Sequence, residues 1–198
     1  MPAARREEIL EAAERLLRRR KVGEVRVEDV VREASAAKGT FYLYFASWEE
    51  MLLAVRSRVY SAFDGRFPPP PQGGDAAEWG AHAAALVHGF VDFVSSLGKL
   101  HDAVFHGPIA QRAVPGEATA ADRVAAFIRA GVAAGAFTGV DPEPTARLIF
   151  AAVHEAIDAI ESGQNRARML RTATSLTWRT LGCEDPQPRR GPRHRSSK

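Results

Sequence analysis

The octapeptide KGTFYLYF, which begins at Lys38, concentrates hydrogen-bond donors and aromatic rings in one short stretch. Lys38 can pair with a phosphate group, and Thr40 can reach either a phosphate or the edge of a base. The hydroxyl groups of Tyr42 and Tyr44 can donate hydrogen bonds to phosphate oxygens. Gly39 lacks a side chain, which allows its backbone to approach another molecule closely. Three interpretations fit these residues: a core helix, an aromatic cage for a ligand, or a helix that reads DNA.

Helical spacing divides the same residues between two faces. Phe41 and Phe45 are four positions apart, so they share one face of a helix. We expect this face to pack against earlier apolar residues, namely Leu16, Val30 and Val31. The hydrogen-bond donors of the octapeptide fall off that face, which favours the DNA-reading interpretation.

Apolar residues recur at helical spacing along almost the whole chain, and strand patterns are nearly absent. The first expected helix is ILEAAERLL, with Gly23 just past its end as a C-terminal cap, and the second is VEDVVREA. After the octapeptide, Ser47 and Glu50 form an S-x-x-E capping box that starts a fourth helix. A proline-rich loop at 68–75 ends it, and the later helices are expected near 76–97, 100–106, 117–135, 143–162 and 165–182.

The first three helices, the last two joined by the short SAAK turn, predict a helix-turn-helix. In such a unit the third helix lies in the major groove of DNA, with its N-terminal residues nearest the bases. Charge is distributed accordingly: residues 1–66 carry a net +2, residues 67–182 a net −2, and residues 183–198 a net +3. The basic ends of the chain are therefore the candidates for contact with a polyanion.

The segment ILEAAERLL…VEDVVREASAAKGTFYLYFASWEEML resembles the DNA-binding domain of the TetR/AcrR family of transcriptional regulators. The resemblance covers about residues 5–55. It rests on K-G-T-F-Y-x-Y-F followed by x-S-x-E-E-x, at this distance from an A-A-x-x-L-L helix. Beyond residue 66 the similarity is mostly architectural.

This resemblance implies an all-α protein. Residues 1–47 are expected to form a three-helix, helix-turn-helix DNA-binding domain. Residues 48–182 are expected to form a larger helical effector-binding and dimerisation domain, whose first helix, 48–66, connects the two. The Pro- and Arg-rich residues 183–198 are expected to be a disordered tail. The family also implies a homodimer that binds a palindromic operator in double-stranded DNA. A small apolar effector, unidentified from the sequence, is expected to release it, so a repressor is the expected role.

Several positions depart from the family pattern. Ser35 stands where the turn commonly has glycine, and Ala37 replaces the usual capping serine, a loss of about 1 kcal/mol of capping. Arg26 stands near a threonine that usually contacts phosphate, and Trp48 stands where a lysine is frequent. The third helix is therefore expected to supply more of the phosphate contacts than usual. The predicted DNA-binding residues are Arg26, Lys38, Gly39, Thr40, Tyr42 and Tyr44.

Two further sets of residues are candidates in the later helices. Aromatic side chains with a few polar neighbours suit a small-molecule pocket, and the predicted effector-pocket residues are Phe90, Phe93, Phe105, His106, Phe127, Phe150 and His154. Small and apolar positions on the last two helices suit a dimer face, predicted as Ala152, Ala156, Ile160, Ala173, Leu176 and Trp178. For both sets the alternative is ordinary packing inside one chain.

Catalysis and metal binding find little support in the sequence. The chain has no G-x-S-x-G, Gly-rich phosphate loop or H-E-x-x-H motif, so no catalytic residue is predicted and we do not expect an enzyme. The pairs His88–Asp92 and His154–Asp158 lack a third ligand nearby in sequence, and no metal or cofactor is expected. The single cysteine, Cys183, excludes an internal disulfide.

Composition fits a globular protein: 198 residues, of which 45% are hydrophobic and 26% charged. No apolar run approaches the roughly 20 residues that span a bilayer, so a cytoplasmic protein without membrane association is expected. Two alternatives to a ligand-responsive repressor stay open. One is an activator without a small-molecule effector, whose DNA affinity no ligand changes. The other is a helical ligand-binding dimer with weak or lost DNA binding.

Overall fold

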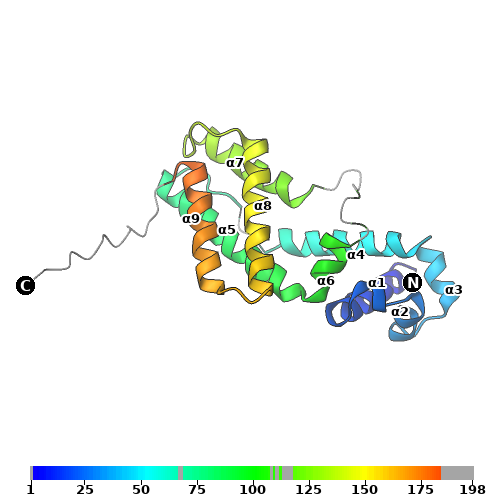
Figure 1. Ribbon diagram of the computed structural model, residues 1–198. Helices are drawn as coiled ribbons and strands as arrows, with labels where there is room; N and C mark the ends of the chain where they lie inside the picture. The colour runs from blue at the N-terminus through cyan, green and yellow to red at the C-terminus, as the bar shows by residue number, and fades with distance from the viewer. Residues whose placement is uncertain (1, 67–68, 108, 110–111, 113–117, 184–198) are drawn as a thin grey trace, which may run out of the picture. The chain divides into compact units, whose positions relative to one another are not determined.

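The computed structural model describes residues 2–66, 69–107, 109, 112 and 118–183, and these residues form α-helices and no β-strand (Figure 1). The predicted all-α fold is confirmed. The α-helices are α1 (Pro2–Arg19), α2 (Val27–Glu33), α3 (Lys38–Tyr44), α4 (Trp48–Asp64), α5 (Ala76–Leu97), α6 (Lys99–His101), α7 (Ala120–Ala133), α8 (Pro142–Glu161) and α9 (Arg166–Leu181). A 3-10 turn, η1 (Val22–Glu24), and a π-helical turn, η2 (Asp102–His106), complete them.

Tertiary contacts divide the chain into two compact units. Unit 1 comprises Met1–Pro68 and Gly89–Thr119, and unit 2 comprises Pro69–His88 and Ala120–Lys198. Helix α5 belongs to both, because its residues up to 88 lie in unit 2 and the rest in unit 1. These units reflect compactness, whereas the boundary expected between residues 47 and 48 is a functional one and stays a prediction.

The core of unit 1 is built from one apolar face of each N-terminal helix. Ile9, Leu10 and Leu17 of α1 are completely buried, and so is Phe41 of α3. Phe45, the residue after α3, is 1% exposed, and its ring lies 5.5 Å from that of Phe41. The expected inward face of the octapeptide is confirmed. Burial of each phenylalanine stabilises the position of α3 by about 1.5–3 kcal/mol.

Helix α2 ends in a Schellman motif whose left-handed residue is Ser35. The Ala36 N–H donates to the carbonyl of Val31 at 2.8 Å, and the Ser35 N–H donates to that of Arg32 at 3.1 Å. The φ angle of Ser35 is +49°. Helices α7, α8 and α9 end with the same hydrogen-bond pattern and have glycine at this position, Gly135, Gly163 and Gly182. A residue with a Cβ in this conformation costs about 1–2 kcal/mol, so the turn before α3 is locally strained.

Two sequence signals for helix ends have different outcomes. The Glu50 N–H donates to Ser47 Oγ at 3.1 Å, which confirms Ser47 as the N-cap of α4, while the Glu50 carboxylate accepts from the Ala46 N–H at 2.7 Å. The prediction of Gly23 as the C-terminal cap of the first helix is wrong. Helix α1 ends at Arg19, and Gly23 lies inside the 3-10 turn η1.

Buried Arg56 joins α4 to the chain that follows η2 within unit 1. Its guanidinium donates to the carbonyl oxygen of Ile109 at 2.9 Å and to that of Arg112 at 2.8 Å. Burying a charged group is tolerated where its donors find acceptors. Arg56 therefore fixes the position of both carbonyls against α4.

Unit 2 has an aromatic core between α5 and α7. The ring of Trp79 lies 5.4 Å from that of Phe127 and 5.6 Å from that of Phe137. Gly131 makes this packing possible, because a Cβ atom there would lie 2.2 Å from the Phe137 ring. Helix α7 packs on α8, and α8 packs on α9.

Within the described part of the chain, no single helix has both the length and the apolar composition needed to cross a membrane. Helix α5 and the following segment 99–106 meet these two criteria only when taken together across a bend of 94°.

Candidate nucleic-acid interface

The outer face of α3 carries the side chains that the sequence assigns to DNA contact. Lys38 and Gly39 are exposed, Tyr42 is 53% exposed, and Thr40 and Tyr44 are half-buried. A Cβ atom on Gly39 would meet nothing within 4 Å, so nothing in the described chain requires glycine there. All five residues reach the surface, and their role at DNA stays a prediction.

Leu43 was missed by the sequence reasoning, although it lies in the same octapeptide. It is 80% exposed, the largest value among the exposed large apolar side chains of the described residues. Helical spacing could have identified it, because Leu43 lies two positions from both Phe41 and Phe45 and so faces away from the side that these two residues share. An exposed leucine beside Tyr42 gives α3 an apolar contact surface suited to a thymine methyl group.

Lys38 is held by an ion pair with Glu28 of α2. Lys38 Nζ lies 2.5 Å from Glu28 Oε1, and about half of each side chain is exposed. The hydrogen bond between them is the main reason that the pKa of Glu28 is lowered and the pKa of Lys38 is raised. In the protein without DNA, the Lys38 amine, which is expected to contact phosphate, is therefore already paired with the Glu28 carboxylate.

Arg26 is the N-cap residue of α2. Its backbone N–H donates to the Asp29 carboxylate at 3.1 Å, which is the largest cause of the lowered pKa of Asp29. Two further arginines, Arg20 and Arg32, lie 3.4 Å from the same carboxylate. The Arg26 side chain itself is exposed, so its charge is available at the start of α2.

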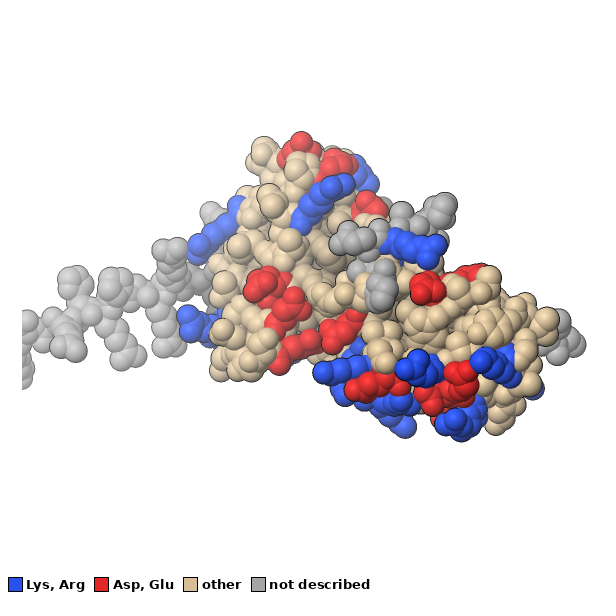
Figure 2. All heavy atoms as spheres, turned by 45° about the vertical axis from the view of Figure 1, so that its right-hand side comes forward, with Lys and Arg blue, Asp and Glu red and all other residues tan. Residues whose placement is uncertain are grey.

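Basic and acidic side chains are interleaved over the N-terminal helices on the face that Figure 2 presents. Ion pairs explain part of this mixture: Arg5 pairs with Glu8 at 2.6 Å, and Arg15 pairs with Glu33 at 2.9 Å. On this face the charges do not form a uniformly basic patch. On this face a phosphate would therefore meet individual basic residues rather than a broad positive field.

The sequence departures have visible structural consequences. Ala37, the N-cap residue of α3, makes no side-chain capping hydrogen bond, as its methyl side chain requires. Trp48 is the first residue of α4 and is half-buried. Neither side chain supplies a charge, so Lys38 and Arg26 are the charged members of the predicted set.

The predicted effector-pocket residues fall into separate groups. In unit 1, the rings of Phe90 and Phe93 lie 5.3 and 5.4 Å from Phe63. Phe105 lies 5.4 Å and His106 4.8 Å from the buried His101. In unit 2, Phe127 belongs to the Trp79 cluster, and Phe150 lies 5.2 Å from His154 on the next turn of α8. Their assignment to one effector pocket stays a prediction.

The predicted dimer residues differ in the surface they offer. Ala156 and Ala173 are 3% and 4% exposed in the single chain, so they retain almost no area to bury against a second copy. Ala152, Ile160 and Trp178 are half-buried, and Leu176 is exposed. The indole N–H of Trp178 donates to the Gly80 carbonyl at 2.7 Å, so this side chain also packs within unit 2.

Leu148 on α8 was missed as a candidate for the same face. It is 69% exposed and lies four residues before Ala152, on the same side of the helix. The sequence signal was its i,i+4 spacing to Ala152. Exposed Leu148 and Leu176 now mark the apolar surface of α8 and α9.

Comparisons with known proteins agree with this architecture. Residues 9–55 match the model of a family described as bacterial regulatory proteins, tetR family. None of the curated proteins matches the chain. Among solved structures, a TetR-family transcriptional regulator from Haemophilus influenzae is 18% identical, with a TM-score of 0.63 over 90% of this chain and 97% of that one.

Two further solved structures are similar to the chain. SmeT, the repressor of the Stenotrophomonas maltophilia multidrug efflux pump SmeDEF, is 23% identical, with a TM-score of 0.66 over 92% of this chain and 97% of that one. RolR in complex with its ligand resorcinol is 20% identical, with a TM-score of 0.57 over 92% and 90% of the two chains. At these identities the likeness concerns the fold alone.

Proposed function

Because the chain belongs to the tetR family of bacterial regulatory proteins, with the family's domain at residues 9–55, we propose that it is a ligand-responsive repressor. In this proposal it binds a palindromic operator as a homodimer, and a small apolar effector releases it. The observation that carries the proposal is the outer face of α3, where Tyr42 and Leu43 project from a helix anchored by buried Phe41 and Phe45.

Helix α3 reads the major groove in this account. Its N-terminal residues, Lys38 to Thr40, lie nearest the bases and the flanking phosphates. Tyr42 donates its hydroxyl to a phosphate, and Leu43 packs against a thymine methyl group. The two buried phenylalanines hold the backbone of α3 rigid, so the exposed side chains are presented in a fixed register.

Lys38 exchanges its partner when DNA binds. In the free protein its amine lies 2.5 Å from the Glu28 carboxylate, and in the complex a phosphate takes that place. The exchange makes the net gain from Lys38 smaller than that from an unpaired lysine.

The homodimer face is proposed on α8 and α9, around Leu148, Ala152 and Leu176. Exposure of two leucines on adjacent helices supports this choice, since burial of such side chains stabilises association. A two-fold axis through this face places one copy of α3 on each half of a palindrome. Half-site spacing of about 34–36 Å then matches one turn of DNA.

The effector acts through its different affinity for two arrangements of the dimer. A largely apolar ligand is proposed because the candidate residues are mainly phenylalanines. The resorcinol complex of one similar structure supports a small aromatic molecule as a starting probe. Binding that favours a different spacing of the two α3 helices lowers operator affinity.

Fluorescence anisotropy with a DNA duplex selected by the wild-type protein tests the proposal. Lys38→Ala combined with Tyr42→Ala should abolish specific binding, while Lys99→Ala, which removes one exposed charge from α6, should preserve it. Circular dichroism and light scattering check that the double variant remains a folded dimer. If the folded double variant bound the duplex as the wild type does, α3 would not be the reading helix.

A further inference from the structure

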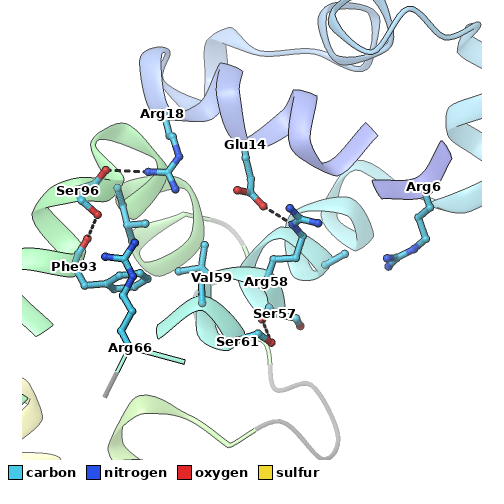
Figure 3. Close-up of a pocket in the computed structure, with 13 residues that line it drawn as sticks. Arg6, Glu14, Arg18, Ser57, Arg58, Val59, Ser61, Arg66, Phe93 and Ser96 are labelled. Carbon is cyan, nitrogen blue, oxygen red and sulfur yellow. Dashed lines mark hydrogen bonds and ion pairs between the residues drawn. The ribbon is translucent and has the colours of Figure 1, made fainter. Parts of the chain in front are cut away.

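A groove opens in unit 1 between α1, α4 and the C-terminal part of α5 (Figure 3). Its volume is about 430 Å³, within the range typical of small-molecule sites. The apolar side chains of Val59, Phe93 and Leu97 line part of the groove and are almost completely buried. No residue of α3 lines it, so the groove is distinct from the proposed DNA-binding face.

Arginines dominate the polar lining. Arg6, Arg18, Arg58 and Arg66 line the groove, against a single carboxylate, Glu14. Arg58 is already neutralised, because it pairs with Glu14 at 2.5 Å and also with Glu7. Burial raises the pKa of Glu14, although the nearby Arg18 opposes this change. Arg6 lies 3.7 Å from the carboxylate of Glu7, so Arg18 and Arg66 are the arginines that leave an excess of positive charge in the groove.

Arg18 and Arg66 lie at the end of the groove that contains Phe93 and Ser96 (Figure 3). Arg18 donates one hydrogen bond, to the Ser96 carbonyl at 2.9 Å, which leaves other guanidinium N–H groups for a ligand. Arg66 lies over the Phe93 ring, 5.2 Å from its centroid. Among the described residues neither arginine lies within ion-pair distance of a carboxylate.

We propose that this groove binds a small organic oxyanion, either a carboxylate or a phosphate monoester. Its charged group lies between Arg18 and Arg66, and the edge of the Phe93 ring borders the space left for its organic part. Guanidinium groups recognise both kinds of oxyanion through paired, charge-assisted hydrogen bonds. A neutral ligand would form no ion pair with either guanidinium group.

The anion's position gives it a means to influence α1. Arg18 belongs to α1, whereas Arg66 follows α4 and Phe93 belongs to α5, so a ligand that bridges them fixes α1 against the other two helices. Helix α1 packs directly on α2 of the helix-turn-helix. If DNA binding requires a different position of α1, a bound anion lowers the affinity for DNA. Bound DNA then lowers the affinity for the anion by the same factor. This linkage rests on the proposed function, but anion binding itself does not.

Isothermal titration calorimetry of the full chain without DNA tests the binding site. The probes are benzoate and phenyl phosphate, with benzyl alcohol as the uncharged comparison. Both anions or one of them should bind at millimolar or lower concentration, and the relative affinities identify the preferred oxyanion. Benzyl alcohol should bind far more weakly, because it offers no charge to the arginines.

Two double variants separate the groove from general charge effects. Arg18→Gln with Arg66→Gln should weaken anion binding by at least about tenfold, given the strength of hydrogen bonds to charged groups. Arg19→Gln with Lys99→Gln removes two exposed charges outside the groove and should leave binding close to that of the wild type. Thermal unfolding confirms that both proteins are folded.

Three results would overturn the proposal. The first is that neither anion binds the wild-type protein, and the second is that both double variants bind as the wild type does. The third is that the two double variants lose affinity equally, which would indicate a diffuse charge effect. Anion binding measured without DNA can succeed even if the protein is not a repressor, so this test and that of the proposed function can fail separately.

Discussion

The ion pair between Lys38 and Glu28 gives a quantitative prediction about DNA binding. Lys38→Gln removes the amine and keeps a side chain of similar length, while Glu28→Gln removes the carboxylate that holds the amine at 2.5 Å in the free protein. We expect opposite effects. Lys38→Gln lowers DNA affinity, and Glu28→Gln raises it, because it removes a negative charge close to the phosphates and frees Lys38.

The size of the effect follows from counterion release. Each phosphate that a basic side chain neutralises contributes about 0.9 to the slope of log affinity against log salt concentration. A dimer has two copies of Lys38, so Lys38→Gln should make that slope shallower by about 1.8. Between about 50 and 200 mM salt, the advantage of the wild type over the variant should shrink by about twelvefold.

Fluorescence anisotropy with a labelled operator duplex, repeated across a salt series, measures both affinity and slope. Lys99→Gln serves as the matched control, since it removes a lysine charge from an exposed position on α6. Its slope should equal that of the wild type. The double variant Glu28→Gln, Lys38→Gln should have the same salt slope as Lys38→Gln alone, because the amine is absent from both variants.

Two outcomes would refute this reasoning. An unchanged slope in Lys38→Gln would mean that the amine contacts no phosphate. A Glu28→Gln protein whose DNA affinity falls as far as that of Lys38→Gln would mean that the ion pair positions α3, and that Lys38 acts only through Glu28.

Three further predictions concern the turn, the base contact and the dimer. Ser35→Gly should raise the free energy of unfolding by about 0.5–1 kcal/mol in urea titration, because relief of the left-handed strain exceeds the extra backbone entropy of glycine. The reverse change, Gly135→Ser, should lower the free energy of unfolding, because Gly135 has a φ of +74° and open space around it. A destabilised Ser35→Gly protein would contradict the strain argument. Leu43→Ala should weaken binding and reduce the preference for thymine at one half-site position by about 1 kcal/mol in binding-site selection, the size of burying one methyl group, whereas an unchanged preference would exclude the methyl contact. Leu148→Arg should convert the dimer to a folded monomer in light scattering, and an unchanged mass would place the dimer face elsewhere.

Local sequence signals predicted the division of α3 well. The i,i+4 spacing of Phe41 and Phe45 was enough to place both rings in the core, because helical periodicity fixes which residues share a face. The same rule places Leu43 on the outward face, although an apolar residue there does not by itself indicate contact with DNA. The ion pair of Lys38 could not be predicted from its charge, because its partner Glu28 lies ten positions earlier and the two side chains meet only across the turn between α2 and α3.

Features that depend on distant parts of the chain could not be predicted in the same way. The groove lined by Arg18, Arg66 and Phe93 draws on three helices whose contacts the sequence does not encode locally. Ala156 and Ala173 look suited to a dimer, yet they are buried inside the single chain. Small residues favour close helix packing both within a chain and between chains, and only the tertiary structure separates these cases.

The most direct test of the central claim, that α3 reads a DNA sequence, is selection of bound duplexes from a random pool. The wild-type protein should enrich a palindrome whose half-site centres lie about 10 bp, or a multiple of this, apart. The folded Lys38→Ala, Tyr42→Ala double variant, carried through the same selection, should enrich nothing. A wild-type pool without an enriched sequence, or the same palindrome recovered with the double variant, would contradict the claim.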